Sequence, residues 1–133
     1  MNHEKHEKHE KILFSNECYQ IQGAIYDVYK EMGCGFLEAV YQECLELEFQ
    51  KREIPYQAQL KLNLSYKGMP LSQSYFPDFL CHNNIIIEIK AVKEILPQHK
   101  AQLMNYLRAT KLSLGLLVNF GAFPKVQIVR LAN

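Results

Sequence analysis

One short run of residues constrains this chain more than any other: Ile85-Ile86-Ile87-Glu88-Ile89-Lys90. The run is mostly apolar and β-branched, and it follows the polar turn Cys81-His82-Asn83-Asn84, so it predicts a buried β-strand. Because side chains alternate across a strand, Glu88 and Lys90 point to the same face. Charges on a core strand are costly unless they are paired or hold an ion, so these two residues need a partner.

A third charged residue, Asp78, follows Pro77 on the segment just before that turn. If the two segments form a hairpin, Asp78 approaches Glu88 and Lys90, and two acids and a lysine gather near one point. The residues alone leave two interpretations open. One is a catalytic, metal-binding cluster; the other is a salt bridge at the end of a sheet, with an aspartate in an ordinary turn.

Two helices are expected before the strands, at about 12–32 and 36–51, because apolar residues recur at intervals of three and four. Gly33-Cys34-Gly35 separates them. Glu38 falls at the edge of the buried face of the second helix, so it can add a third carboxylate to the cluster. It can equally be an acid that the helix dipole favours in the first turn.

The rest of the chain alternates between strand and helix patterns. Strict alternation over 56–66 predicts a half-exposed strand, and 71–80 and 85–91 follow it in a meander. A helix from Pro97 to about Ala109 carries Gln102 and Tyr106 on one side, and strands are expected at 112–119 and 125–131. The order α-α-β-β-β-α-β-β predicts an α/β (α+β) fold with a mixed β-sheet flanked by helices.

Length and charge limit the organisation of the chain and its partners. The 133 residues suffice for one domain, expected at 12–133 after a polar His-Glu-Lys tail at 1–11. The net charge of +1 gives no whole-molecule attraction to nucleic acid, so basic contacts must be local. Candidate phosphate contacts are Lys93, Lys100 and Arg108.

Two further features bear on location. No apolar stretch reaches about 18 residues, so no membrane span is expected. The N-terminus lacks the apolar segment of a secretory signal, and the four cysteines form no CxxC pair, so a cytoplasmic protein with reduced thiols is expected.

The acids suit a hard divalent cation. Mg²⁺ or Mn²⁺ prefers oxygen ligands, and two or three carboxylates suffice to bind one. Such a cation polarises a phosphoryl oxygen and activates a water, while Lys90 can stabilise the developing charge. The backbone carbonyl of Ile89, between the two charged side chains, can complete the coordination, and Gln102 can orient a ligand or substrate group.

Three motifs, taken in order, resemble those of a known superfamily. Pro77-Asp78 with Glu88-Ile89-Lys90 resembles the PD-(D/E)XK signature of the restriction-endonuclease-like nucleases. The segment 35–41, GFLEAVY, is similar to the motif that names the GxxExxY family within that superfamily. Residues 102–106, QLMNY, resemble the QxxxY motif of RecB-type nucleases. The resemblance covers about 21–131, and Cys34 departs from it because relatives often have proline there.

The resemblance implies an α-β-β-β-α-β core with the acids at one end of the sheet. It implies a Mg²⁺-dependent phosphodiesterase that acts on DNA, or second on RNA, and a homodimer is open because such nucleases often cut two strands as dimers. The other hypothesis is a non-catalytic or accessory binding module with the same fold, since a minimal core leaves little room for DNA recognition. Carried over by motif, the implied metal ligands are Glu38, Asp78 and Glu88, the catalytic lysine is Lys90, and the supporting residues are Gln102, Tyr41 and Tyr106.

Overall fold

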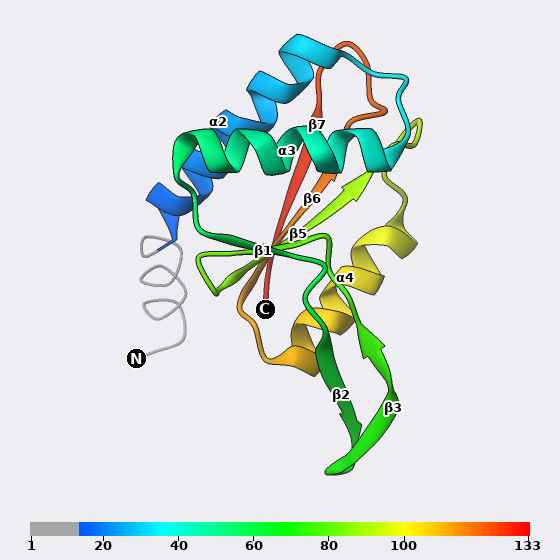
Figure 1. The fold of residues 1–133 in the computed structure, drawn as a ribbon. Helices are drawn as coiled ribbons and strands as arrows, with labels where there is room; N and C mark the ends of the chain where they lie inside the picture. Colours follow the sequence, from blue (N-terminus) through cyan, green and yellow to red (C-terminus); the bar gives the residue numbers. More distant parts are fainter. Residues whose placement is uncertain (1–13) are drawn as a thin grey trace, which may run out of the picture.

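A five-stranded sheet forms the centre of the protein in a computed structural model that describes residues 14–133 (Figure 1). Strands β5 and β6 are parallel, and the other neighbours in the sheet are antiparallel. The tail expected at 1–11 and the helix start expected at Ile12 lie outside the described residues. In spatial order the strands are β1 (Tyr56–Ala58), β4 (Phe79–Cys81), β5 (Ile85–Lys90), β6 (Leu114–Asn119) and β7 (Gln127–Ala132).

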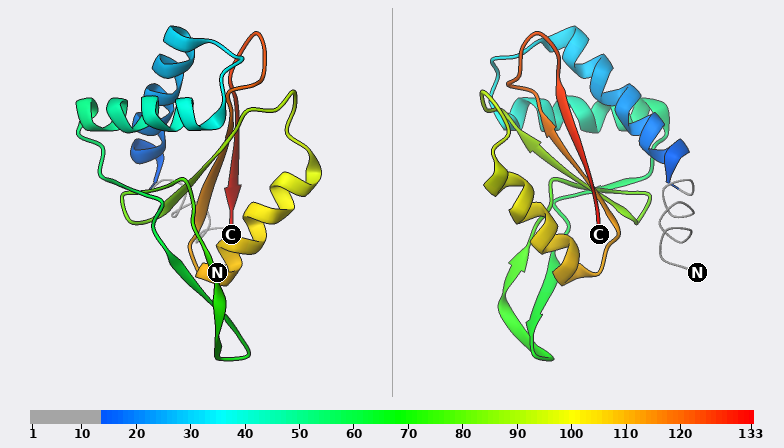
Figure 2. Two further views of the ribbon diagram at one scale, coloured as in Figure 1. Left: turned by 45° about the vertical axis from the view of Figure 1, so that its right-hand side comes forward. Right: turned by 180° about the vertical axis from the view of Figure 1, so that it is seen from behind.

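Helices cover both faces of this sheet (Figure 2). Helices α2 (Ser15–Met32) and α3 (Glu38–Arg52) lie on one face, and α4 (Pro97–Thr110) lies on the other. Alternate residues of β5 enter the two cores: Ile87 packs beneath α2 and α3, whereas Ile86 packs with the leucines of α4. Because Glu88 and Lys90 alternate in the same way, they belong to the α4 face.

The strands β2 (Leu62–Tyr66) and β3 (Met69–Tyr75) form a separate antiparallel ribbon that projects from the body of the protein (Figure 1). The expected meander is therefore wrong in detail, because each of its first two strands is divided. Gln59, at φ 57°, interrupts the first strand, and residues 76–78 interrupt the second. After the break at Gln59 the alternating apolar residues change cores: Tyr56 packs toward α2 and α3, and Leu62 packs toward α4.

The predicted α/β fold class is confirmed: a mixed sheet flanked by helices, with the elements in roughly the expected order. Strand β6 is buried along its whole length and β7 is the edge strand, as the sequence predicted. That residues 12–133 are a single domain stays a prediction. Among residues 14–133, no helix is long and apolar enough to cross a membrane.

Candidate functional site

Two of the predicted acids meet where β4 and β5 begin to separate. The last paired residues of the two strands are Phe79 and Ile87, so Asp78 stands opposite Glu88 just beyond them. The Asp78 N–H donates to Glu88 Oε1 at 3.0 Å, and the Ile89 N–H donates to Asp78 Oδ2 at 2.7 Å. Each carboxylate thus takes the place of a backbone partner that the sheet no longer supplies. The short turn after β4 makes this arrangement possible.

Burial makes both of these carboxyl groups weaker acids than usual. It raises the pKa of Glu88 to about 7, and the negative charge of Asp78 acts in the same direction. Burial also raises the pKa of Asp78, although the Ile89 N–H opposes the shift, and the charge of Glu38 raises it further. The two carboxylates therefore repel one another in a partly desolvated place that favours an added positive charge.

Lys90 supplies some of that charge without forming a salt bridge. Its positive charge lowers the pKa of both Asp78 and Glu88, which places its ammonium near the pair. Within residues 14–133, however, no ion pair of 4.0 Å or less joins Lys90 to either acid. The salt bridge at the end of the sheet, which was one of the two interpretations of the sequence, is therefore absent among these residues.

Glu38 lies in the first turn of α3, near enough for its charge to act on Asp78, and its side chain is exposed. The loop before it is fixed by Tyr41, whose hydroxyl donates to the Gly33 carbonyl at 2.5 Å and accepts from the Phe36 N–H at 3.2 Å. The fully buried Tyr41 ring stacks on Phe120 with 4.4 Å between centroids. Tyr41 thus ties together the loop that leads into the first turn of α3, where Glu38 lies.

Gln42, one turn after Glu38, connects α3 to Asp78. Its Nε2 donates to the Asp78 carbonyl at 3.3 Å, and the Gln59 N–H donates to the same oxygen at 3.2 Å. The Gln59 side chain also donates to Gln42 Oε1 at 3.2 Å. Because Gln42 is neutral and adds no second acid, no role was predicted for it from the sequence, although its position four residues after Glu38 places both on one side of the helix.

Tyr75 is a second residue near the acids that no sequence pattern singled out. It is only 5% exposed, and its buried hydroxyl lies beside the Glu88 carboxylate, although no hydrogen bond of good geometry joins that hydroxyl to any described residue. Burial and the nearby charge of Glu88 raise the pKa of Tyr75 well above its usual value, so the hydroxyl keeps its proton. Tyr106 stacks on Tyr75 at 3.8 Å, and in this way the QxxxY tyrosine contacts the site indirectly.

Asn119 is a third residue that the sequence did not single out, and it holds the chain just beyond the site. Its fully buried Oδ1 accepts from the N–H groups of Val92 and Gly121, each at 3.0 Å. Asn119 also pairs with Lys90 in the register of β5 and β6. It therefore fixes both loops that leave the sheet beside Lys90, and no pattern in the sequence distinguished it from other strand residues.

The remaining predicted residues lie further out. Gln102 is exposed on α4, makes no hydrogen bond to the acids in the part of the chain described, and lines a cavity against the ribbon. Lys93, Lys100 and Arg108 are exposed as well. Their roles, and that of the Ile89 carbonyl, stay predictions.

The donor set suits a divalent cation in chemistry, but it is not preassembled. Among residues 14–133, no three His, Cys, Asp or Glu side chains are grouped closely enough to hold an ion. Two features still fit a bound cation: the carboxyls of Asp78 and Glu88 have raised pKa values that a positive charge would relieve, and the buried Tyr75 hydroxyl beside Glu88 can donate to a ligand oxygen. Glu38 stands apart from these two acids, exposed in the first turn of α3.

The chain is similar to known proteins both in fold and in sequence. The crystal structure of SSO0001 aligns with a TM-score of 0.58 at 19% identity, over 71% of this chain and 49% of that one. This chain therefore spans about half the length of that protein, and at such identity the likeness shows the fold alone. No curated protein matches. A family model described as the PD-(D/E)XK nuclease superfamily matches residues 15–131. Since this match covers almost all of the described residues, the chain belongs to the PD-(D/E)XK nuclease superfamily.

Proposed function

We propose that the protein hydrolyses phosphodiester bonds in DNA in a reaction that depends on Mg²⁺ or Mn²⁺. The superfamily implies a nucleic-acid substrate, and its nucleases usually use divalent metals. One observation carries the proposal: Asp78 and Glu88 are fixed by reciprocal hydrogen bonds to each other's strand, with Lys90 on the same face. Two carboxylates with raised pKa values and a neighbouring lysine are typical of a functional site.

Each side chain has a role in this proposal. Asp78, Glu88 and Glu38 hold the cation, and the Ile89 carbonyl is a further oxygen donor. When bound by these residues, a divalent cation would supply Lewis-acid chemistry, polarising a phosphoryl oxygen and making a water more acidic. Lys90 stabilises the negative charge that develops on the phosphoryl oxygens, and the protonated Tyr75 hydroxyl donates a hydrogen bond toward the same space.

Cleavage by the pure protein tests this function. Labelled single-stranded DNA, duplex DNA and RNA are incubated with Mg²⁺, with Mn²⁺ or with EDTA. Asp78→Ala and Lys90→Ala are expected to lower the rate by about 100-fold or more. Glu43→Ala, an exposed acid on α3, is the matched control and should cleave normally. Cleavage that survives both site substitutions would disprove the assignment.

A non-catalytic module with the same fold is the second candidate. It is favoured by the lack of a preassembled group of metal ligands in residues 14–133 and by the net charge of only +1. Titration with Mn²⁺ in a calorimeter separates the two candidates. No measurable affinity, together with no cleavage, would support the module.

Two finer assignments complete the proposal. Membership in the GxxExxY branch is supported by the part that Gly35, Glu38 and Tyr41 play in shaping the start of α3. A homodimer would let two copies cut the two strands of a duplex. Light scattering with and without DNA measures directly whether the protein is a dimer. A monomer that makes double-strand breaks would argue against the homodimer.

A further inference from the structure

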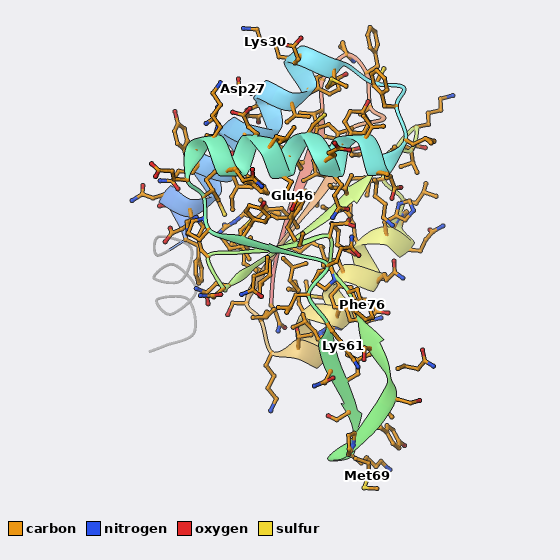
Figure 3. The ribbon with its side chains drawn as sticks, viewed as in Figure 1. Asp27, Lys30, Glu46, Lys61, Met69 and Phe76 are labelled. Carbon is orange, nitrogen blue, oxygen red and sulfur yellow. The ribbon has the colours of Figure 1, made fainter. Side chains whose placement is uncertain are left out.

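The charges of this chain are divided between the two sides of the sheet. In 14–53, which form α2 and α3, acids outnumber bases; Figure 3 labels Asp27 and Glu46 among these acids. By contrast, 54–77 hold Lys61 and Lys67 and no acid, and no acid follows Glu94. The bases on or beside α4 are Lys93, Lys100, Arg108 and Lys111. The near-neutral total thus conceals a basic side made of α4 and the ribbon.

A groove separates α4 from the ribbon on this basic side. It is a cavity of about 350 Å³, and β2 packs along α4 beside it. The helix residues that line it fall at intervals of three and four, so they form one stripe along α4. The lining consists of Leu64, Ser65 and Leu71 from the ribbon, and Gln102, Asn105, Tyr106 and Ala109 from the helix.

Two stacked tyrosines link the groove to the acidic site. Tyr106 lines the cavity and stacks on Tyr75 at 3.8 Å, and the Tyr75 hydroxyl lies beside Glu88. A chain lying in the groove would therefore contact Tyr106, which is separated from Glu88 by the ring of Tyr75. The outer part of the ribbon is also apolar and open, with Tyr66 62% exposed and Met69 67% exposed; Figure 3 shows Met69 at its tip.

We propose that this groove binds a single strand of nucleic acid and accepts an unpaired base between α4 and the ribbon. The inference rests on the proposed function, since the strand bound here is the substrate of that site. A duplex is excluded from the cavity because its bases are paired and stacked inside the helix. Aromatic and aliphatic walls suit base stacking, and the amides of Gln102 and Asn105 suit hydrogen bonds to base edges. The surrounding lysines and Arg108 suit phosphates.

Two alanines on α4 allow a matched test. Ala109 lines the groove and Ala101 does not, yet both are exposed on the same helix. Ala109→Glu and Ala101→Glu therefore change the net charge equally, but only Ala109→Glu places its carboxylate in the lining of the groove. Fluorescence anisotropy, in EDTA to prevent cleavage, measures the binding of a labelled oligothymidylate of about twelve nucleotides and of a duplex of the same length.

The full chain is expected to bind the single strand more tightly than the duplex. Ala109→Glu should weaken single-strand binding by about tenfold or more, and Ala101→Glu by about twofold or less. Thermal unfolding checks that both variants are folded. Asn105→Asp, which keeps the shape of the side chain and adds one charge in the groove, is the second variant and should weaken binding in the same way.

Three results would overturn the groove: equal losses in the two alanine variants, equal affinity for duplex and single strand, or no binding of nucleic acid at all. The last includes the case in which the groove takes a protein partner. Cleavage separates this inference from the proposed function. If the wild type cleaves DNA while Ala109→Glu binds normally, only the groove fails. If the groove variants lose binding but no metal supports cleavage, only the proposed reaction fails.

Discussion

The two faces of strand β5 differ sharply although they belong to the same six residues. Toward α2 and α3 the strand presents Ile85, Ile87 and Ile89, which are almost wholly buried in a large apolar core. Toward α4 it presents Ile86, then Glu88 and Lys90, which are only partly buried. One face contributes apolar burial, and the other contributes groups whose charged forms burial disfavours.

This difference indicates how a small domain can keep a destabilised site. The α2 and α3 face carries the larger core, which includes the fully buried Tyr41, Phe49, Phe79 and Phe120. We infer that this core supplies most of the stability. It thereby offsets the cost of burying the carboxyl groups of Asp78 and Glu88 on the α4 face. Substitutions on the two faces of the sheet test that division.

Phe49→Ala should destabilise the protein by about 3–5 kcal/mol, because it removes a fully buried ring from the α2 and α3 core. Phe49 contacts Phe79 and Tyr56 with ring centroids 5.1 and 5.6 Å apart, so both lose a packing partner. Urea unfolding measures the change. Leu47→Ala, on the same helix but 61% exposed, is the control and should cost under about 0.5 kcal/mol. Similar losses in the two variants would show that this face is not the source of stability.

The second prediction concerns pH on the other face. Because burial raises the pKa of Glu88 to about 7 from 4.5, the folded protein binds this proton more tightly than the unfolded chain does. Protonation of Glu88 therefore contributes most to the free energy of unfolding below about pH 4.5, and this contribution is lost as the pH rises through 7. Relative to Glu88→Gln, the wild type should lose at most about 3 kcal/mol of stability between pH 4.5 and pH 8.

Unfolding of both proteins across this pH range, without metal, checks the sign. Comparison with Glu88→Gln cancels the titration of groups elsewhere in the chain. Added Mn²⁺ should reverse the trend, because the metal binds the ionised carboxylate and stabilises the fold more at pH 8 than at pH 5.5. A pH-independent difference between the two proteins would contradict the raised pKa of Glu88.

Much of the site was predictable because it is local in sequence. Asp78 and Lys90 are close along the chain, and a short turn joins their strands, so alternation alone places Glu88 and Lys90 on one face. Glu38 required more, because its position depends on how α3 packs against the sheet. Helical periodicity placed Glu38 only at the edge of the buried face of its helix. Its role as a metal ligand was implied by the resemblance alone.

The divided strands were not predictable from periodicity. Alternation continues across Gln59, so the pattern gives no sign that Tyr56 and Leu62 enter different cores. For the same reason alternation placed Tyr75 in a strand but not beside Glu88, since that contact depends on where the ribbon leaves the sheet. These features follow from tertiary packing, which no local pattern records.

Tyr41→Phe should have a smaller effect on stability, about 1–2 kcal/mol, because it leaves the Gly33 carbonyl and the Phe36 N–H without their partner. It should also weaken Mn²⁺ binding severalfold, since Glu38 follows this loop. Tyr29→Phe is the matched control: it removes one hydroxyl that donates to the Ala122 carbonyl on the same side of the sheet. That control should lower stability without changing metal affinity. Equal metal affinity in the two variants would mean that Tyr41 is structural only.

The smallest effect is expected on the outer surface of α2 and α3, at Arg52. Its guanidinium donates to Glu48 at 2.8 Å and pairs with Asp27, so it joins the two helices in an exposed network. Arg52→Gln should cost under about 1 kcal/mol in urea unfolding at low salt, and less as salt screens the charges. Cleavage and single-strand binding should not change, because this acidic surface lies across the sheet from the groove. If Arg52→Gln weakened nucleic-acid binding while leaving stability intact, the substrate would contact the α2 and α3 side, and the division between a stabilising face and a functional face would fail.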